Sequence, residues 1–271
     1  MTPPAADGLQ KRPRATVEVA TPVGGWPPPW PNVAELAAVL PADRWTLVGG
    51  LMTQLHTAHH GIGVVRPTND VDVVLHVETI RGVPDATATA LEGLGYRLRE
   101  TVDPRNNTAH RFVRGTSNVD VVSGAADGDV VDVLMSDHAA PAVVERLRGR
   151  DMVRIEGGTQ ALRRTMNAVL EITDAERRTI SVPSPLGAVI LKAAAYATDS
   201  RDRDRHLFDA AALLACIADP FADRDDLRGS DRRRLTTLRK ALSDDHPAWR
   251  QLPRDDRANA DAALRILLSD N

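Results

Sequence analysis

Two aspartates stand one residue apart in the most strand-like stretch of the chain, DVDVVLHV, which begins at Asp70. Successive side chains of a β-strand point to opposite faces, so Asp70 and Asp72 would share one face. Two carboxylates that lie so near each other repel, and the pKa of one of them rises unless a cation or a basic group lies between them. Oxygen ligands of this kind suit Mg²⁺ or Mn²⁺. The pattern favours a divalent-metal site, and the alternative is an edge strand whose polar face meets water.

A glycine pair, Gly49 and Gly50, lies about 20 residues upstream, between a short apolar strand and a helical segment. Glycines let backbone N–H groups approach an anion without an intervening Cβ, and a helix N-terminus favours negative charge. Such a turn is often only a turn, but here the pattern Arg-x-Thr-x-Asp-x-Asp follows it. The combination predicts phosphate binding beside the metal site. Arg66 and Thr68 precede the metal strand, where Arg66 could contact phosphate or only shape a turn.

The glycine turn, the helix and the Asp-x-Asp strand together resemble the nucleotidyltransferase superfamily. That resemblance implies a third carboxylate on a later, neighbouring strand. Asp132 fits this position because it lies in the apolar run VVDVL, where a charge needs a partner or a metal. Asp120, in NVDVV, is the competing candidate, and we favour Asp132.

The second half of the chain narrows the resemblance. Residues 182–217 look like the helical region of the AbiEii-like and MenT-type nucleotidyltransferase toxins, which carry a lysine in an apolar helix and a later Asp-x-x-x-Leu-Leu motif. Here these residues are Lys192 and Asp209. From the residues alone, Lys192 could extend to solvent or hold a triphosphate. Asp209 could form a local salt bridge with Arg205 or His206, one helical turn away, or position Lys192 or the acceptor.

The patterning predicts an α+β fold. We expect a flexible Pro- and Gly-rich arm over residues 1–31, with Trp26 and Trp30 able to dock on the body. A nucleotidyltransferase core, a mixed β-sheet flanked by helices, should follow over residues 32–150. An all-helical C-terminal domain, interrupted by one strand or extended stretch near residues 177–185, should fill residues 151–271.

Composition excludes several classes of protein. Cys216 is the only cysteine, so no intramolecular disulfide can form, and no apolar run approaches the roughly 18 residues of a membrane span. We therefore expect a soluble, cytoplasmic protein with no membrane contact, and a monomer. The net charge of −3 gives no general case for nucleic-acid binding, although residues 223–240 hold seven Arg or Lys against four Asp. His56, His59 and His60 have helical spacing and are expected on a solvated helix face.

The resemblance implies nucleotidyl transfer from an NTP to an acceptor hydroxyl. Asp70, Asp72 and Asp132 would bind Mg²⁺ or Mn²⁺, and Asp132 would also help to activate the hydroxyl. Gly49, Gly50 and Lys192 would hold the nucleotide, with Arg66 and Thr68 beside them.

For the toxin branch, the resemblance implies a tRNA 3′ acceptor end, a block of translation and a possible cognate antitoxin. Thr68 has the position of a hydroxyl that is phosphorylated in some toxin relatives, where added negative charge would crowd the metal carboxylates. One alternative is a small-molecule nucleotidyltransferase of the aminoglycoside-modifying kind, with Asp199, Asp202 and Asp204 forming an acidic acceptor pocket. The other alternative is a non-catalytic member that binds a partner.

Overall fold

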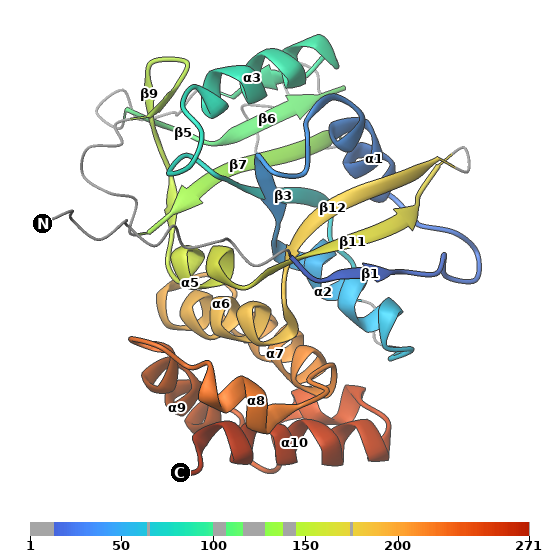
Figure 1. The fold of residues 1–271 in the computed structure, drawn as a ribbon, viewed down its shortest axis with the longest axis vertical. Helices are drawn as coiled ribbons and strands as arrows, with labels where there is room; N and C mark the ends of the chain where they lie inside the picture. Colours follow the sequence, from blue (N-terminus) through green and yellow to red (C-terminus); the bar gives the residue numbers. More distant parts are fainter. Residues whose placement is uncertain are drawn as a thin grey trace, which may run out of the picture.

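The computed structural model of the protein describes residues 14–63, 66–99, 107–115, 128–137, 145–173 and 176–270. A six-stranded mixed sheet forms its centre (Figure 1). Five strands follow the order β2-β3-β7-β6-β4, and β10 pairs with β7. Their bounds are Trp45–Leu47 for β2, Asp70–Leu75 for β3, Asp129–Ser136 for β7, Arg111–Arg114 for β6, Arg97–Leu98 for β4 and Arg154–Ile155 for β10.

The two strands at the middle of this sheet carry the acidic residues. β3 and β7 run parallel, and Asp72 is paired with Asp132 in their register. Val71 and Val73 of β3 are fully buried, as is Val133 of β7. The alternation of aspartate with valine therefore places the carboxylates on one face and the apolar side chains in the core, as the sequence predicts.

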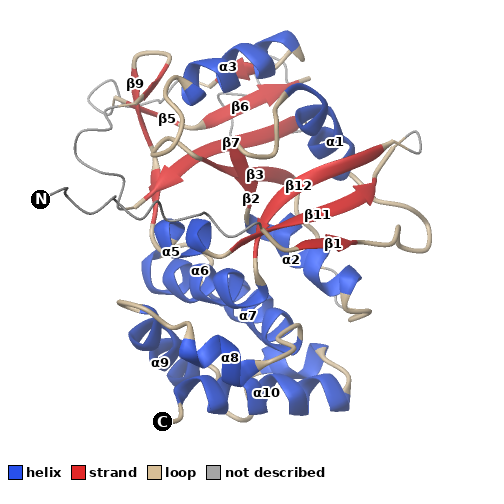
Figure 2. Ribbon diagram, in the orientation of Figure 1, coloured by secondary structure: helices blue, strands red, loops and turns tan. Residues whose placement is uncertain are grey.

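Helices α1 (Trp30–Val39), α2 (Gly49–His59) and α3 (Val83–Gly93) belong to the same part of the molecule (Figure 2). Both α1 and α2 pack against β3. α2 starts at the glycine pair, directly after β2, and its N-terminus has no side-chain cap. The chain thus leaves the sheet beside β3 and enters a helix whose first-turn N–H groups lie near the acidic face of the sheet.

The N-terminal arm is packed on the body over residues 14–31, and both tryptophans dock there as expected. Residues 1–13 of the expected flexible arm lie outside the described residues. β1 (Thr16–Glu18) pairs in parallel with β11 (Thr165–Glu171). Trp26 and Trp30 are buried with ring centroids 4.4 Å apart. Burying two large aromatic rings is favourable enough to hold a segment that has little regular structure of its own.

Residues 150–171 also differ from the expected helical pattern. Besides helix α5 (Gly158–Arg163), this stretch forms the strands β9 (Arg150–Met152), β10 and β11. The strand or extended stretch expected near residues 177–185 is β12 (Arg177–Pro183). β12 pairs with β11, while β9 joins β5 (Thr108–Ala109) and β8 (Arg146–Leu147) in a small third sheet. The second half of β12 is buried on both faces, with Ile180, Ser181 and Val182 all fully buried. The division of the chain into domains at residue 150 stays a prediction.

The described chain after residue 184 is helical (Figure 1). Ser184 caps helix α6 by accepting a hydrogen bond from the Gly187 N–H, and the proline at position 185 occupies the first turn. The helical elements are α6 (Pro185–Thr198), α7 (Asp204–Ala215), α8 (Pro220–Asp225), α9 (Asp231–Ala241), the 3₁₀ helix Pro247–Gln251 and α10 (Arg254–Leu268). No helix in the described residues is long and apolar enough to cross a membrane.

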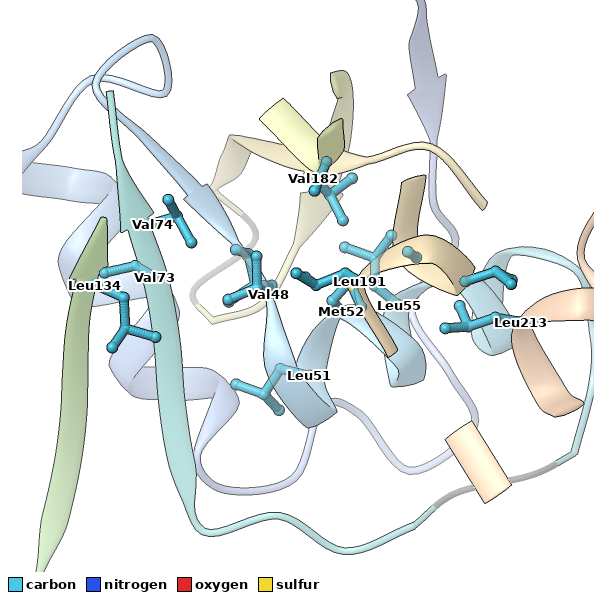
Figure 3. Close-up of a cluster of buried hydrophobic side chains, with 14 of the residues drawn as sticks. Val48, Leu51, Met52, Leu55, Val73, Val74, Leu134, Val182, Leu191 and Leu213 are labelled. Atoms are coloured by element: carbon cyan, nitrogen blue, oxygen red, sulfur yellow. The ribbon is translucent and has the colours of Figure 1, made fainter. Parts of the chain in front are cut away.

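One apolar core joins the sheet to these helices (Figure 3). Met52 of α2 and Leu191 of α6 lie within the cluster shown, together with Leu213 of α7. Each of these side chains is at most 5% exposed. The helical part therefore packs directly against the helix that begins at the glycine pair.

Candidate active site

A cavity of about 560 Å³ opens where the start of α2, the loop before β3 and the N-terminal ends of β3 and β7 meet helices α6 and α7. Eight of the nine residues that the sequence predicts for the site line it. These residues are Gly49, Gly50, Arg66, Thr68, Asp70, Asp72, Asp132 and Lys192. The ninth, Asp209, lies beneath the cavity with 2% of its surface exposed.

Three carboxylates converge at the sheet side of this cavity. Asp70, Asp72 and Asp132 each offer one oxygen atom, and these atoms lie within 4.8 Å of one another. Asp70 and Asp72 share a face of β3, and the parallel register brings Asp132 of β7 beside Asp72. The competing candidate, Asp120, lies outside the described residues.

The charge of this cluster is not balanced by the protein alone. Burial, together with the nearby charges of Asp70 and Asp132, raises the pKa of Asp72 to about 7, although Lys192 and Arg111 act in the opposite direction. A cation held by the three carboxylates would relieve this repulsion. Three aspartate oxygens are also the donor set that Mg²⁺ or Mn²⁺ prefers, so the residues present fit a divalent metal.

The glycine pair allows the close approach of α2 to this cluster. Gly49 has φ +70°, and a Cβ there would lie 1.8 Å from Oδ2 of Asp72. A Cβ on Gly50 would lie 2.8 Å from the Cβ of Thr68. Thr68 in turn donates its hydroxyl hydrogen bond to Oδ1 of Asp70 at 2.8 Å. Both glycines are therefore required by crowding against the side chains of Asp72 and Thr68, a second reason for them beside the expected access for phosphate.

A buried ion-pair network lies on the helical side of the cavity. Lys192 Nζ donates to Asp209 Oδ2 at 2.6 Å, and Arg66 donates from Nε to Asp209 Oδ1 at 2.9 Å. Lys192 is 4% exposed, so the interpretation of a lysine that extends to solvent is wrong. Burial alone would raise the pKa of Asp209, but Lys192 and Arg66 hold it below its usual value. Asp209 therefore positions both cations.

The local salt bridge considered for Asp209 forms at another residue. Arg205 and His206, one helical turn before Asp209, both donate to Asp199 Oδ2 at 3.0 Å. Asp199 also accepts hydrogen bonds from the backbone N–H groups of Arg201 and Asp202, the first of which is the main cause of its lowered pKa. This turn between α6 and α7 forms the outer wall of the cavity.

One prediction about a side chain outside the acidic cluster needs correction. His56 is buried and bonded to the Pro183 carbonyl oxygen at 2.8 Å, so the expected solvated face is wrong at this position. α2 is covered there by the chain that leads from β12 into α6.

Arg111 also lines the cavity, and the sequence did not predict it as a site residue. Its only sequence signal is the alternation in HRFVRG, which places it on one face of a strand whose partner is unknown from sequence.

Comparison with known proteins points to one family. The family model described as "Nucleotidyl transferase AbiEii toxin, Type IV TA system" matches residues 33–268, most of the chain. A comparison with curated proteins gave no significant match. Among solved structures, the crystal structure of an antigenic nucleotidyltransferase-like protein from Paracoccidioides brasiliensis is similar, with 15% sequence identity, 86% of this chain and 93% of that chain covered, and a TM-score of 0.46.

Proposed function

The chain belongs to the AbiEii nucleotidyltransferase toxin family of type IV toxin–antitoxin systems, and we propose that it transfers a nucleotide from an NTP to the 3′ acceptor end of tRNA in a metal-dependent reaction. Family membership makes the chain a nucleotidyltransferase and implies a cognate antitoxin. The convergence of Asp70, Asp72 and Asp132 on one cavity is the observation that supports metal dependence. Transfer to tRNA would stop aminoacylation and therefore translation.

In this mechanism the three aspartates would hold Mg²⁺ or Mn²⁺. The bound ion would supply charge neutralisation for the attacking and leaving oxygens of an in-line displacement. Asp132 accepts the proton of the acceptor hydroxyl, whose oxygen forms a bond to the α-phosphorus of the NTP. The bond between that phosphorus and the bridging oxygen of the β-phosphate breaks, and pyrophosphate leaves.

The remaining charges in the cavity suit a triphosphate. Its described lining includes five aspartates and five Arg or Lys side chains: Arg66, Arg111, Lys192, Arg201 and Arg205. Because three of the aspartates would share a divalent cation, the balance left for the substrate is positive. Lys192, fixed by Asp209, supplies a point charge for phosphate, and the N–H groups of α2 after Gly49 and Gly50 supply donors.

The family and the outer wall of the cavity favour tRNA as the acceptor. Arg205 is 45% exposed in its side chain, and Arg201 is exposed next to it, so both can meet a phosphate backbone at the cavity mouth. The basic segment 223–240 contributes less than its composition indicates. Arg228 and Arg232 donate to backbone carbonyl oxygens within the protein.

A small-molecule acceptor is the second candidate, and one observation favours it. Asp202 is exposed and lines the cavity, where it could meet a cationic substrate. Asp199 lines the cavity too, but Arg205 and His206 already occupy its carboxylate. Asp204 is not among the residues that line it.

The antitoxin could act through Thr68. Its hydroxyl lies 2.8 Å from Asp70 Oδ1, so a phosphate on Thr68 would place two negative charges beside the metal carboxylates. Mass spectrometry of toxin made with and without its genomic neighbour tests whether Thr68 is phosphorylated, and an unmodified Thr68 in silenced toxin argues against it.

We assign the active protein to the cytoplasm, where tRNA and NTP are available, and to the monomeric state.

The test of the proposed function uses total tRNA, Mg²⁺ and each α-labelled NTP in turn, followed by a denaturing gel. We expect label in the tRNA band with the wild type and none with Asp72→Ala. Digestion with an exonuclease specific for 3′ ends should release the label. Label transferred to an aminoglycoside but not to tRNA would favour the small-molecule alternative, and equal labelling by wild type and Asp72→Ala would refute the metal assignment.

A further inference from the structure

Arg111 lies beside the three carboxylates that would hold the metal, but it is not itself a metal ligand. The antiparallel register of β6 and β7 places Arg111 opposite Asp132. Its guanidinium donates from Nε to Asp132 Oδ1 at 2.8 Å and from Nη2 to Asp132 Oδ2 at 2.6 Å. Both oxygens of Asp132 are therefore already engaged.

The same guanidinium reaches toward a second carboxylate of the cluster. Nη2 of Arg111 lies 3.9 Å from Asp70 Oδ2 and only 2.6 Å from Asp132 Oδ2. It thus lies between two of the three side chains that would share a metal ion. A guanidinium is charged at every physiological pH, so it serves as an internal counter-ion for the cluster when no metal is bound.

Two cations cannot occupy the same space between Asp70 and Asp132. Arg111 is 33% exposed in its side chain and lines the cavity, whereas Asp132 is only 8% exposed. The arginine is therefore the member of the pair that can move. A shift of its Nη2 away from Asp132 would direct that donor into the cavity, toward the space left for the triphosphate.

We propose that Arg111 is a positioning residue that couples metal binding to nucleotide binding. Its Nη2 offsets part of the negative charge of Asp70 and Asp132 in the empty enzyme and competes there with the divalent cation. When the carboxylates hold the cation, Arg111 keeps its Nε bond to Asp132 and turns Nη2 to the triphosphate. This inference rests on the metal-dependent reaction proposed above, and it predicts that metal binds weakly until a nucleotide gives Arg111 a new partner.

The competing explanation is that Arg111 only orients Asp132. The two explanations predict opposite changes in the metal affinity of the nucleotide-free protein. Loss of an orienting partner would weaken Mn²⁺ binding, whereas loss of a competing cation would strengthen it. The experiment therefore measures Mn²⁺ binding to the metal-free protein by electron paramagnetic resonance, and then calorimetric binding of tripolyphosphate at saturating Mn²⁺, which avoids any dependence on the base.

For Arg111→Gln we expect a Mn²⁺ Kd about tenfold lower than that of the wild type and a tripolyphosphate Kd about tenfold higher, each equivalent to about 1.4 kcal/mol. Arg111→Lys keeps the charge but not the fork geometry, so its Mn²⁺ affinity should stay near that of the wild type. It also provides a variant with the charge retained if Arg111→Gln unfolds. A Mn²⁺ Kd that is unchanged or raised in Arg111→Gln overturns the proposal, and an unchanged tripolyphosphate Kd overturns its nucleotide half.

Arg114→Gln is the matched control. Arg114 lies on the same strand and makes ion pairs with Asp129 and Glu35, both at 2.8 Å, but does not line the cavity. Its replacement should leave both Kd values unchanged. Absence of Mn²⁺ binding in wild type and Arg111→Gln alike would overturn the metal-dependent function itself. Mn²⁺ binding that appears only in Arg111→Gln would support competition between Arg111 and the metal ion.

Discussion

Lys192 of α6 and Asp209 of α7 are joined by a 2.6 Å hydrogen bond between Nζ and Oδ2, and both side chains are almost fully buried. Arg66, from the loop before β3, binds the same carboxylate. One aspartate therefore fixes two cations that arrive from distant parts of the sequence. It ties helices α6 and α7 to the loop that leads into the strand of Asp70 and Asp72.

Removing one member of this pair should cost more than removing both. Asp209→Ala leaves Lys192 and Arg66 without their counter-ion, and we expect a loss of about 3–5 kcal/mol in the free energy of unfolding. The double variant Lys192→Met with Asp209→Leu leaves a single cation, Arg66, which can turn to solvent, and should recover most of that loss. Urea denaturation measures both. The double variant should still lack transfer activity, and full activity would show that the pair serves only stability.

The carboxylate of Asp72 should be costly to the metal-free fold. Asp72→Asn removes one of three crowded charges, so in the presence of a chelator we expect the variant to be more stable than the wild type, by on the order of 2 kcal/mol after solvent screening. Transfer activity should fall by about a thousandfold or more. Thermal melting with and without Mg²⁺ tests this prediction. A less stable variant in chelator would contradict the electrostatic account of the site.

The glycine pair offers a test with an internal control. Gly49→Ala adds a methyl group into Asp72 at a residue with positive φ, so we expect about 2–5 kcal/mol of destabilisation and roughly a hundredfold loss of activity. Gly61→Ala, also at positive φ but with no atom within 4 Å of the added Cβ, should cost only the backbone strain of about 1–2 kcal/mol. Equal effects of the two changes on activity would remove the argument from crowding.

His56 should make stability depend on pH. Burial lowers its pKa to about 4, whereas the ordinary value of 6.5 applies in the unfolded chain. The unfolded state therefore binds a proton first, and stability falls as the pH decreases from about 6.5 to about 4. Over that window the wild type should lose about 3 kcal/mol relative to His56→Gln, whose amide can still donate to Pro183. Denaturation curves of both proteins at several pH values check the difference, and parallel curves would contradict it.

Local sequence patterns were enough for the acidic strand and the start of α2. Valine alternation sets the face of Asp70 and Asp72, whereas Asp132 as the third carboxylate follows from the family resemblance, and the parallel register of β3 and β7 brings it into the cluster. Arg111 could not be predicted because its role depends on which strand pairs with β6, and strand order is not a local property. The expectation of helix over the residues of β11 is wrong for a related reason. β11 is held by pairing with β12 on one side and with the N-terminal β1 on the other.

The Asp209 network also sets the order in which the parts of the cavity become available along the chain. The glycine turn and the acidic cluster all lie before residue 133, but the counter-ion of Lys192 and Arg66 comes at residue 209 of 271. A chain that ends before α7 already holds the three carboxylates but lacks the carboxylate that Lys192 and Arg66 share. Both cations would stay unpaired until α7 has been added, so we expect the cavity to be completed last on its helical side.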